Sequence, residues 1–329
     1  MPANLSPEYL KLDERLHQAR EPQEKLSLMR EMLRVIPKHK GTEKMQADLK
    51  RRISALEETV EKQRRRGGRD LFHIAREGVG QILVAGPPNS GKSSLVAWLT
   101  AASPAIANYP FTTQQPLPGM VVFEDVKIQL VDMPALSRDF TEPGLYNSYR
   151  ICDRILLVAD LSDPDPVASL QECIRLLDEH LIRVVAHPVT DEVGSLSTIE
   201  KRALIVANKL DLAGPGVREA FEAAYGATFH VHACSTETGE GIEALPALLF
   251  ADLELVRIYT KKPGKKFVRD APFVLPAGAS VYDVARAIHK DIADSLRFVR
   301  LWGSGKHEGL PVPRDHIVCD GDILEFHAG

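Results

Sequence analysis

The stretch GPPNSGKSS, residues 86–94, constrains this chain more than any other, because it matches the pattern G-x-x-x-x-G-K-[ST]. The residues before it, 82–85, are apolar, and SLVAWLT behind it has helical character. A strand, a glycine-bounded loop and a helix in this order place backbone N–H groups and a helix dipole around a phosphate. The residues expected to line this phosphate site are Gly86, Pro87, Pro88, Asn89, Ser90, Gly91, Lys92, Ser93 and Ser94.

Two side chains of this loop have expected roles in the chemistry of the phosphates. Lys92 is placed to reach the β- and γ-phosphate oxygens, and the hydroxyl of Ser93 to bind Mg²⁺. The pattern therefore predicts a nucleotide site with magnesium as cofactor.

A second motif, NKLD at residues 208–211, identifies the base. In such a loop the carboxylate of Asp211 accepts hydrogen bonds from N1–H and the 2-amino group of guanine, and adenine offers neither donor there. We expect Asn208 to tie this loop to the phosphate loop and the stem of Lys209 to cover the base. The stretch CSTETGEGI, residues 234–242, follows the next strand, and a backbone N–H near Ser235 and Thr236 is expected to bond the guanine oxygen. The sequence thus predicts GTP and GDP as ligands.

Apolar segments alternate with helix-length spacers between residues 70 and 253, which predicts an α/β nucleotide-binding domain with a mostly parallel, doubly wound sheet. The expected strands cover residues 82–85, 120–124, 127–132, 155–160, 203–208 and 228–234. The second and third are close enough to form a hairpin, separated by Asp125 and Val126. Residues 1–69 form a predicted helical region, with apolar residues of one long helix at Met45, Leu49, Ile53, Leu56 and Val60. Residues 254–329 predict a small α+β domain, in the order strand, strand, helix, strand, strand.

Composition limits the location and the partners of the chain. No run of about 18 apolar residues is present, and the N-terminus lacks an apolar signal-peptide core, so we expect a cytoplasmic protein with no membrane partner. Its four scattered cysteines are typical of reduced thiols. Net charge is +5 over residues 1–66, −11 over 67–253 and +2 over 254–329, so any nucleic-acid surface is expected at the two ends. DNA sequence recognition is not expected, and for the N-terminal helices RNA binding and structural support remain equal alternatives.

Together these motifs resemble the translation-factor class of GTPases, and within it the Obg-related group. NYPFTT, residues 108–113, is similar to the switch I stretch of that group, which implies that Thr113 contacts Mg²⁺ and the γ-phosphate. VDMPAL, residues 131–136, stands where D-x-P-G belongs, which implies that Asp132 lies near Mg²⁺. The C-terminal domain resembles a TGS domain, a ubiquitin-like β-grasp, through VRIYTKKPGK and DHIVCDGDILEF. The whole chain resembles the developmentally regulated GTP-binding protein (Drg) subfamily.

Two departures from the family qualify what the resemblance implies. The large family insertion before the N-K-x-D strand is replaced by the shorter segment 183–202. Ala135 stands in place of the switch II glycine, which keeps the backbone N–H expected at the γ-phosphate but restricts the loop.

The resemblance implies slow GTP hydrolysis, in association with ribosomes, ribosomal RNA or a translation factor. Leu136 cannot orient the attacking water as the glutamine of Ras-type GTPases does. In several members of the family the asparagine at position 89 helps bind K⁺, which offsets transition-state charge. The expected catalytic residues are Lys92, Thr113 and Asn89. The alternative is a GTP-binding adaptor with little turnover; a P-loop kinase fits the N-K-x-D motif poorly.

Overall fold

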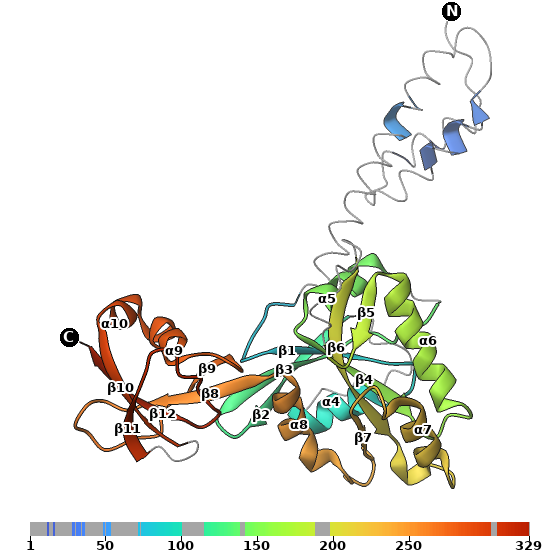
Figure 1. The fold of residues 1–329 in the computed structure, drawn as a ribbon. Helices are drawn as coiled ribbons and strands as arrows, with labels where there is room; N and C mark the ends of the chain where they lie inside the picture. The colour runs from blue at the N-terminus through green and yellow to red at the C-terminus, as the bar shows by residue number, and fades with distance from the viewer. Residues whose placement is uncertain are drawn as a thin grey trace, which may run out of the picture. The chain divides into compact units, whose positions relative to one another are not determined.

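The computed structural model describes a defined part of the chain, in two units divided between Leu71 and Phe72 (Figure 1). The described residues are 12, 16, 28–29, 31–33, 35–36, 49, 51–53, 72, 74–100, 115–138, 142–187, 198–303 and 308–328. In the first unit Leu49 and Ile53 are buried with Met32 and Ile36 in one apolar cluster. The rest of the predicted N-terminal helical region, including Met45, Leu56 and Val60, lies outside the described residues.

The second unit contains two sheets, of which the larger has seven strands. Its strands are β1 (Gln81–Ala85), β2 (Leu117–Phe123), β3 (Val126–Asp132), β4 (Arg154–Asp160), β5 (Ile182–Val185), β6 (Ile199–Asn208) and β7 (Val231–Ala233). The order is β2-β3-β1-β4-β6-β5, and β7 pairs with the second half of β6. All pairs are parallel except β2 with β3. The predicted α/β class, the mostly parallel sheet and the hairpin are therefore confirmed.

Three details of this sheet differ from the sequence prediction. The hairpin turn consists of Glu124 and Asp125, one residue earlier than expected, because Phe123 pairs with Val126. Strand β6 begins at Ile199, and its first four residues pair with the unpredicted strand β5. The segment 183–202 thus contributes residues to both strands. Neither the four-residue β5, IRVV, nor the charged start of β6, IEKR, is long enough to give an alternating pattern of its own.

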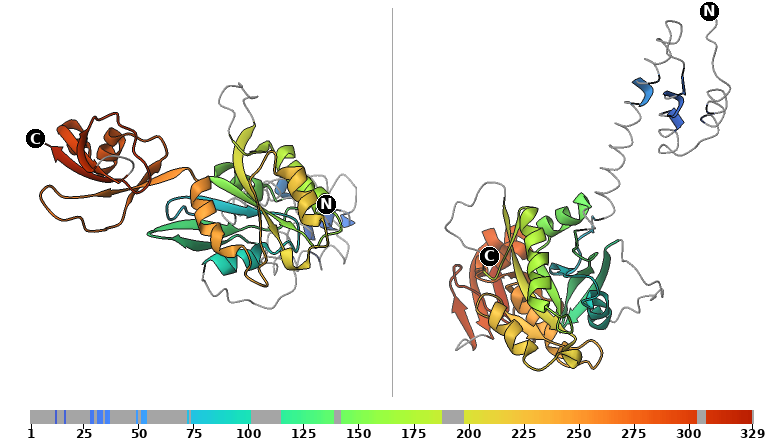
Figure 2. Two further views of the ribbon diagram at one scale, coloured as in Figure 1. Left: turned by 60° about the horizontal axis from the view of Figure 1, so that its bottom comes forward. Right: turned by 90° about the vertical axis from the view of Figure 1, so that its right-hand side faces the viewer.

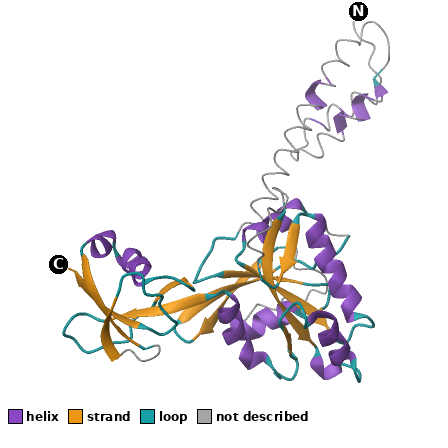
Figure 3. Cartoon of the chain, in the orientation of Figure 1, coloured by secondary structure: helices purple, strands orange, loops and turns teal. Residues whose placement is uncertain are grey.

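Both faces of the large sheet are covered by helices, as Figure 3 shows. The helices are α4 (Lys92–Thr100), α5 (Pro143–Ile151), α6 (Pro166–Glu179), α7 (Val217–Tyr225) and α8 (Leu245–Asp252). Residues of α5, α6 and α7 share one core with Leu83 and Leu157, and residues of α4 and α8 share the other with Val84 and Leu156. Because β1 and β4 are apolar on both faces, they read as continuous apolar runs, which is typical of parallel sheets.

The smaller sheet belongs to the C-terminal part. Its elements are β8 (Leu255–Thr260), β9 (Phe273–Pro276), α9 (Val281–Ile288), α10 (Lys290–Asp294), β10 (Leu296–Trp302), β11 (Glu308–Val312) and β12 (Ile323–Ala328). The strand order is β11-β10-β12-β8-β9, with β12 and β8 parallel. Both helices are seen beside this sheet in Figure 2, and their apolar residues share its core. The predicted strand, strand, helix, strand, strand order is present.

Two features of this smaller domain were not predicted. Strand β11 was missed because its sequence, EGLPV, contains Gly and Pro, which weaken a strand pattern. The single predicted helix is two helices, separated at His289, whose φ of −167° is extended backbone. The start of α9 follows from sequence, because Ser280 and Asp283 form a reciprocal capping box. Among the described residues no helix combines the length and apolarity that a membrane span needs.

Candidate functional site

The phosphate loop follows β1 and depends on two glycines. Gly86 has φ 155°, and a Cβ there would lie 2.3 Å from the carbonyl oxygen of Val158. Gly91 has φ 87°, and a Cβ there would lie 2.2 Å from Nδ2 of Asn208. Neither contact can relax easily, since one partner is backbone and the other a buried, hydrogen-bonded amide. The loop can therefore take this shape only with glycine at both ends.

Lys92 is the first residue of α4 and is only 6% exposed. Its Nζ donates to the carbonyl oxygen of Pro87 at 2.7 Å, and Oγ of Ser90 donates to the same oxygen at 3.0 Å. Burial lowers the pKa of Lys92 to about 8, against the opposing charge of Asp132. A partly desolvated ammonium at a loop of backbone amides is suited to phosphate oxygens, which would restore its charge.

The expected metal ligands Ser93 and Asp132 lie next to each other. Oγ of Ser93 donates to Oδ2 of Asp132 at 2.6 Å, and Asp132 is the last residue of β3. Burial raises the pKa of Asp132, although Ser93 and Lys92 act against the shift. Its Oδ1 is buried without a hydrogen-bond partner among the described residues. An orphaned carboxylate oxygen beside a hydroxyl fits a hard cation that retains its waters, so these residues fit Mg²⁺. Thr113 lies outside the described residues.

The side chain of Asn208 connects three loops at the carboxyl ends of the strands. Asn208 is fully buried, and its Nδ2 donates to the carbonyl oxygen of Ser90 in the phosphate loop at 3.0 Å. Its Oδ1 accepts from the amide of Thr236, in the loop after β7, at 3.2 Å. The side-chain amide of Asn208, in the base loop 208–211, therefore fixes the positions of the phosphate loop and of the loop after β7 relative to its own loop.

The loop after β7 is organised around Ser235, which is fully buried. Its Oγ donates to Oδ1 of Asp211 and accepts from the amides of Glu237 and Thr238 at 3.2 and 3.1 Å. Asp211 is exposed in the 3₁₀ turn Leu210–Leu212. The carboxylate expected to read guanine is thus oriented by the neighbouring loop and accessible to a ligand.

Asp160 is a site residue that the sequence analysis missed. It ends β4 beside Asn208, and its Oδ2 accepts from Nζ of Lys209. Burial raises the pKa of Asp160, but the hydrogen bonds from Lys209 and Ser162 outweigh this and leave the pKa lowered. Lys209 has φ 62°, so an ion pair holds a residue in the left-handed region at the base loop. The position of Asp160, at the end of an apolar strand, was the signal that could have identified it.

The switch II segment is held against the core. The amide of Leu136 donates to the carbonyl oxygen of Gly86 at 3.1 Å, and its side chain is 2% exposed within the apolar core. Arg138 forms ion pairs with Glu172 and Glu179 of α6. The side chain that replaces the glutamine of Ras-type GTPases therefore points into protein. Ala135, the residue in place of the switch II glycine, is half-buried.

The remaining residues expected at the phosphates lie on the surface of the loop. Pro87 is half-buried, and Pro88, Asn89 and Ser94 are exposed. Asn89 has φ 61°, a left-handed conformation that asparagine adopts more readily than most residues. Loop shape alone therefore accounts for an asparagine here, and its exposure leaves the side chain accessible to a cation.

Comparison with known proteins agrees with this arrangement. A family model described as "50S ribosome-binding GTPase" matches residues 81–209, and the TGS domain model matches residues 256–328. An uncharacterized GTP-binding protein of Methanocaldococcus jannaschii is 27% identical, with 92% of each chain covered. Developmentally-regulated G-protein 2 of Arabidopsis thaliana is 24% identical, covering 88% of this chain and 87% of the relative. Ribosome-interacting GTPase 1 of Saccharomyces cerevisiae is 25% identical, covering 77% and 83%.

The two family matches are adjacent along the chain, and the first contains the phosphate loop and reaches Lys209 of the base loop. The relatives align over most of their own length, so the likeness includes both domains. The chain therefore contains a GTPase domain followed by a C-terminal TGS domain, and its relatives include developmentally regulated GTP-binding proteins.

Proposed function

We propose that this protein binds GTP and GDP with Mg²⁺, hydrolyses GTP slowly, and acts in the cytoplasm with ribosomes or translation factors. The observation that carries the proposal is the bridge made by Asn208 between Ser90 and Thr236. Through this bridge Lys92 at the phosphates and Asp211 at the base serve one ligand.

Guanine specificity rests on the orientation of Asp211. A carboxylate accepts two hydrogen bonds from the N1–H and 2-amino edge of guanine, whereas adenine would leave it desolvated and unpaired. Ser235 holds Oδ1 of Asp211 in place from the loop after β7. Backbone amides of that same loop are the groups proposed to meet the guanine oxygen.

We propose slow hydrolysis because the site has groups that can stabilise charge in the transition state, whereas Leu136 cannot orient the attacking water. Lys92 meets charge that develops on the transferring phosphoryl group, and Mg²⁺ at Ser93 and Asp132 would offset more of it. Thr113 is the proposed third contact to the metal. Leu136 is buried in the core and cannot orient water. We therefore propose that catalysis depends on charge, with K⁺ beside Asn89 as a second cation.

One observation favours the alternative of a GTP-binding adaptor. The amide of Leu136 ties switch II to the phosphate loop, which restrains the movement that hydrolysis and switching require. The exposed ion pairs of Arg138 with α6 add a weaker contact. The rate measurements below separate this alternative from a slow enzyme.

The proposed partner class rests on charge and on the relatives. The two ends of the chain carry net positive charge, and a yeast relative is named a ribosome-interacting GTPase. The cytoplasmic location is supported by the thiols. Cys152, Cys173, Cys234 and Cys319 are all free in the structure, as is typical of proteins in a reducing compartment.

The base assignment predicts a change of specificity in Asp211→Asn. The amide can donate to the 2-oxo group of xanthine but cannot accept both guanine donors, so GTP affinity should fall by about 100-fold or more while XTP binds. Titration of fluorescent GTP, ATP and XTP against both proteins measures this. Glu237→Gln, an acidic change in the neighbouring loop, is the matched control and should keep its preference for GTP. Equal affinity of the wild type for ATP and GTP would contradict the assignment.

The lowered pKa of Lys92 predicts a pH-dependent affinity. Bound phosphate raises that pKa again, so GDP binding should take up ~0.5 proton at pH 8 and almost none at pH 6.5. Affinity should be level below pH 8 and fall by up to about tenfold per unit above it, as long as guanine keeps its N1 proton. Calorimetry in two buffers of different ionisation enthalpy measures the uptake. Absence of uptake at pH 8 would show that Lys92 is already fully charged in the free protein.

The role of Asn89 predicts stimulation by potassium. The intrinsic rate should be on the order of 10⁻⁴–10⁻³ s⁻¹, as in unassisted Ras, and higher in K⁺ than in Na⁺ at equal ionic strength. Asn89→Gly keeps the left-handed backbone but removes the amide oxygen, so it should lose the difference while retaining GDP affinity. Asn89→Asp retains an oxygen ligand and should keep part of the rate difference between K⁺ and Na⁺. Single-turnover hydrolysis is the measurement. Equal rates in both salts would mean that Asn89 only shapes the loop. No turnover in either salt would favour the GTP-binding adaptor.

The partner proposal predicts cosedimentation with ribosomes that weakens steeply with salt, because phosphate contacts release counterions. The measurement compares GDP and a GTP analogue at low and high salt. A chain lacking residues 1–69 tests whether the basic helical region contributes, provided that it retains GDP binding. Absence of cosedimentation at low salt in both nucleotide states would exclude a direct ribosome contact.

A further inference from the structure

The turn between β2 and β3 lies at the opposite end of β3 from the metal-site residue. Strand β3 runs from Val126 beside the turn to Asp132 at the proposed Mg²⁺ site, without a break in its pairing to β2. Strand β2 begins shortly after the switch I stretch that contains Thr113. The hairpin therefore joins both proposed phosphate-sensing segments to one distant turn.

Of the two turn residues, Glu124 is not explained by the backbone. Glu124 has φ 49° at the first central position of a two-residue hairpin turn. Glycine is the residue favoured there, because it has no Cβ to clash at positive φ. A glutamate in this position costs local stability, so its reason lies in what the side chain contacts.

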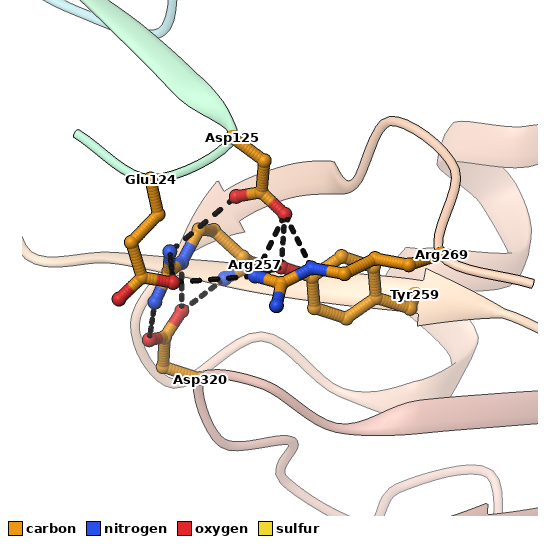
Figure 4. Close-up of polar contacts among 6 residues, drawn as sticks. All are labelled: Glu124, Asp125, Arg257, Tyr259, Arg269 and Asp320. Atoms are coloured by element: carbon orange, nitrogen blue, oxygen red, sulfur yellow. Dashed lines mark hydrogen bonds and ion pairs between the residues drawn. The ribbon is translucent and has the colours of Figure 1, made fainter. Parts of the chain in front are cut away.

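Both turn carboxylates contact the same arginine of the TGS domain, as Figure 4 shows. Arg257 of β8 places Nη1 at 2.7 Å from Oε2 of Glu124 and 3.4 Å from Oδ1 of Asp125. The other side of its guanidinium binds Asp320 of the same domain, with Nε at 3.0 Å and Nη2 at 2.7 Å. Arg257 is thus shared between a pair of carboxylates from one domain and a bidentate carboxylate from the other.

The Arg257 guanidinium is also shielded from water. Its Cζ lies 5.1 Å from the ring centre of Phe123 and 5.0 Å from that of Phe250, and its side chain is 8% exposed. The hydrogen bonds that Arg257 donates to Asp320, the largest contribution, and to Glu124 raise the pKa of Arg257 despite its burial. A buried guanidinium that lost its partners from one domain would remain uncompensated, so these contacts are strongly coupled.

A second cation of the TGS domain completes the contact. Arg269 places Nη2 at 3.1 Å from Asp125 and 3.2 Å from Glu124, and it lies over the ring of Tyr259. The hydroxyl of Tyr259 donates to Oδ2 of Asp125. Because Arg269 is 58% exposed, its ion pairs are screened and weaker than those of Arg257.

We propose that this cluster, the hairpin–TGS joint (Glu124, Asp125, Arg257, Tyr259, Arg269 and Asp320), couples the TGS domain to the nucleotide site. A shift of β2 or β3 in response to the γ-phosphate moves the turn carboxylates relative to Arg257, whose other side stays fixed on Asp320. By linkage, if the bound nucleotide changes the affinity of the TGS domain for a partner by some factor, that partner changes the affinity for the nucleotide by the same factor. The coupling rests on the proposed binding of guanine nucleotides.

The variant that tests the joint is Glu124→Gly with Asp125→Asn. Gly-Asn is a favoured sequence for a two-residue hairpin turn, so the hairpin is retained while both carboxylates are lost. A matched control, Glu219→Gln with Glu222→Gln, removes two acidic charges from α7, which contributes no residue to the joint. Arg269→Gln tests the joint from the TGS side without altering the GTPase domain.

Hydrogen–deuterium exchange of β8, residues 255–260, is measured without nucleotide, with GDP and with a GTP analogue, while fluorescence titration gives both affinities. In the wild type and the control, β8 exchange should differ between GDP and the analogue. In the double turn variant, β8 should exchange faster and equally in both states, and the GDP-to-analogue affinity ratio should change by about fivefold or more. Arg269→Gln should change the β8 exchange and the affinity ratio in the same direction as the double turn variant, but by a smaller amount.

Two results would overturn the coupling in distinguishable ways. If the wild type binds both nucleotides but β8 exchange is the same in each, or if the turn variant keeps the wild-type difference, the joint is only an adhesive contact. If the wild type binds no guanine nucleotide in the titration, the proposed function fails and the coupling fails with it.

Discussion

The buried side chain of Asn208 is the interaction on which the candidate site depends. Its amide nitrogen and oxygen hold Ser90 and Thr236, which belong to loops after β1 and after β7. It can do so because β1, β4 and β6 are parallel and end at one edge of the sheet, where ligands of such folds bind. Loss of this amide would leave buried polar groups unpaired in two loops at once, so the loops proposed to bind phosphate and base depend on one side chain.

In the candidate site, the groups proposed for binding and the position expected to orient water lie on different segments. The groups proposed to hold a nucleotide, Lys92, Ser93 and Asp211, lie on the phosphate loop and its neighbours, which are fixed by the sheet. The group that would position water belongs to switch II, where Leu136 is committed to the apolar core. Burial of the Leu136 side chain stabilises the fold and keeps that side chain away from the attacking water. The proposed K⁺ beside Asn89 would add to the charge stabilisation by Lys92 and Mg²⁺, which is why the potassium dependence is informative.

The TGS domain contacts the β2–β3 turn of the GTPase domain through a desolvated arginine, Arg257. Ion pairs in water contribute little, but Arg257 is desolvated between two aromatic rings and three carboxylates. Such a contact tolerates little displacement, because a guanidinium without its partners is costly to bury. A rigid seven-residue strand leads from that contact to Asp132, so the fold itself supplies a connection between the two domains.

The sequence by itself determined the features that are local along the chain. The phosphate loop, the N-K-x-D loop and the apolar strands are short patterns whose spacing follows from backbone geometry, and they were sufficient to predict the α/β class. The TGS domain was predicted from a family resemblance, through VRIYTKKPGK and DHIVCDGDILEF. Strands β5 and β11 escaped prediction because β5 has only four residues and β11 contains Gly309 and Pro311; their pairing with β6 and β10 defines them. Tertiary structure alone decided that Asp160 holds Lys209, that Leu136 is withdrawn into the core, and that Glu124 meets Arg257. Each of these contacts joins residues distant in sequence, and their energy comes from burial and charge pairing that exist only once the sheets have formed.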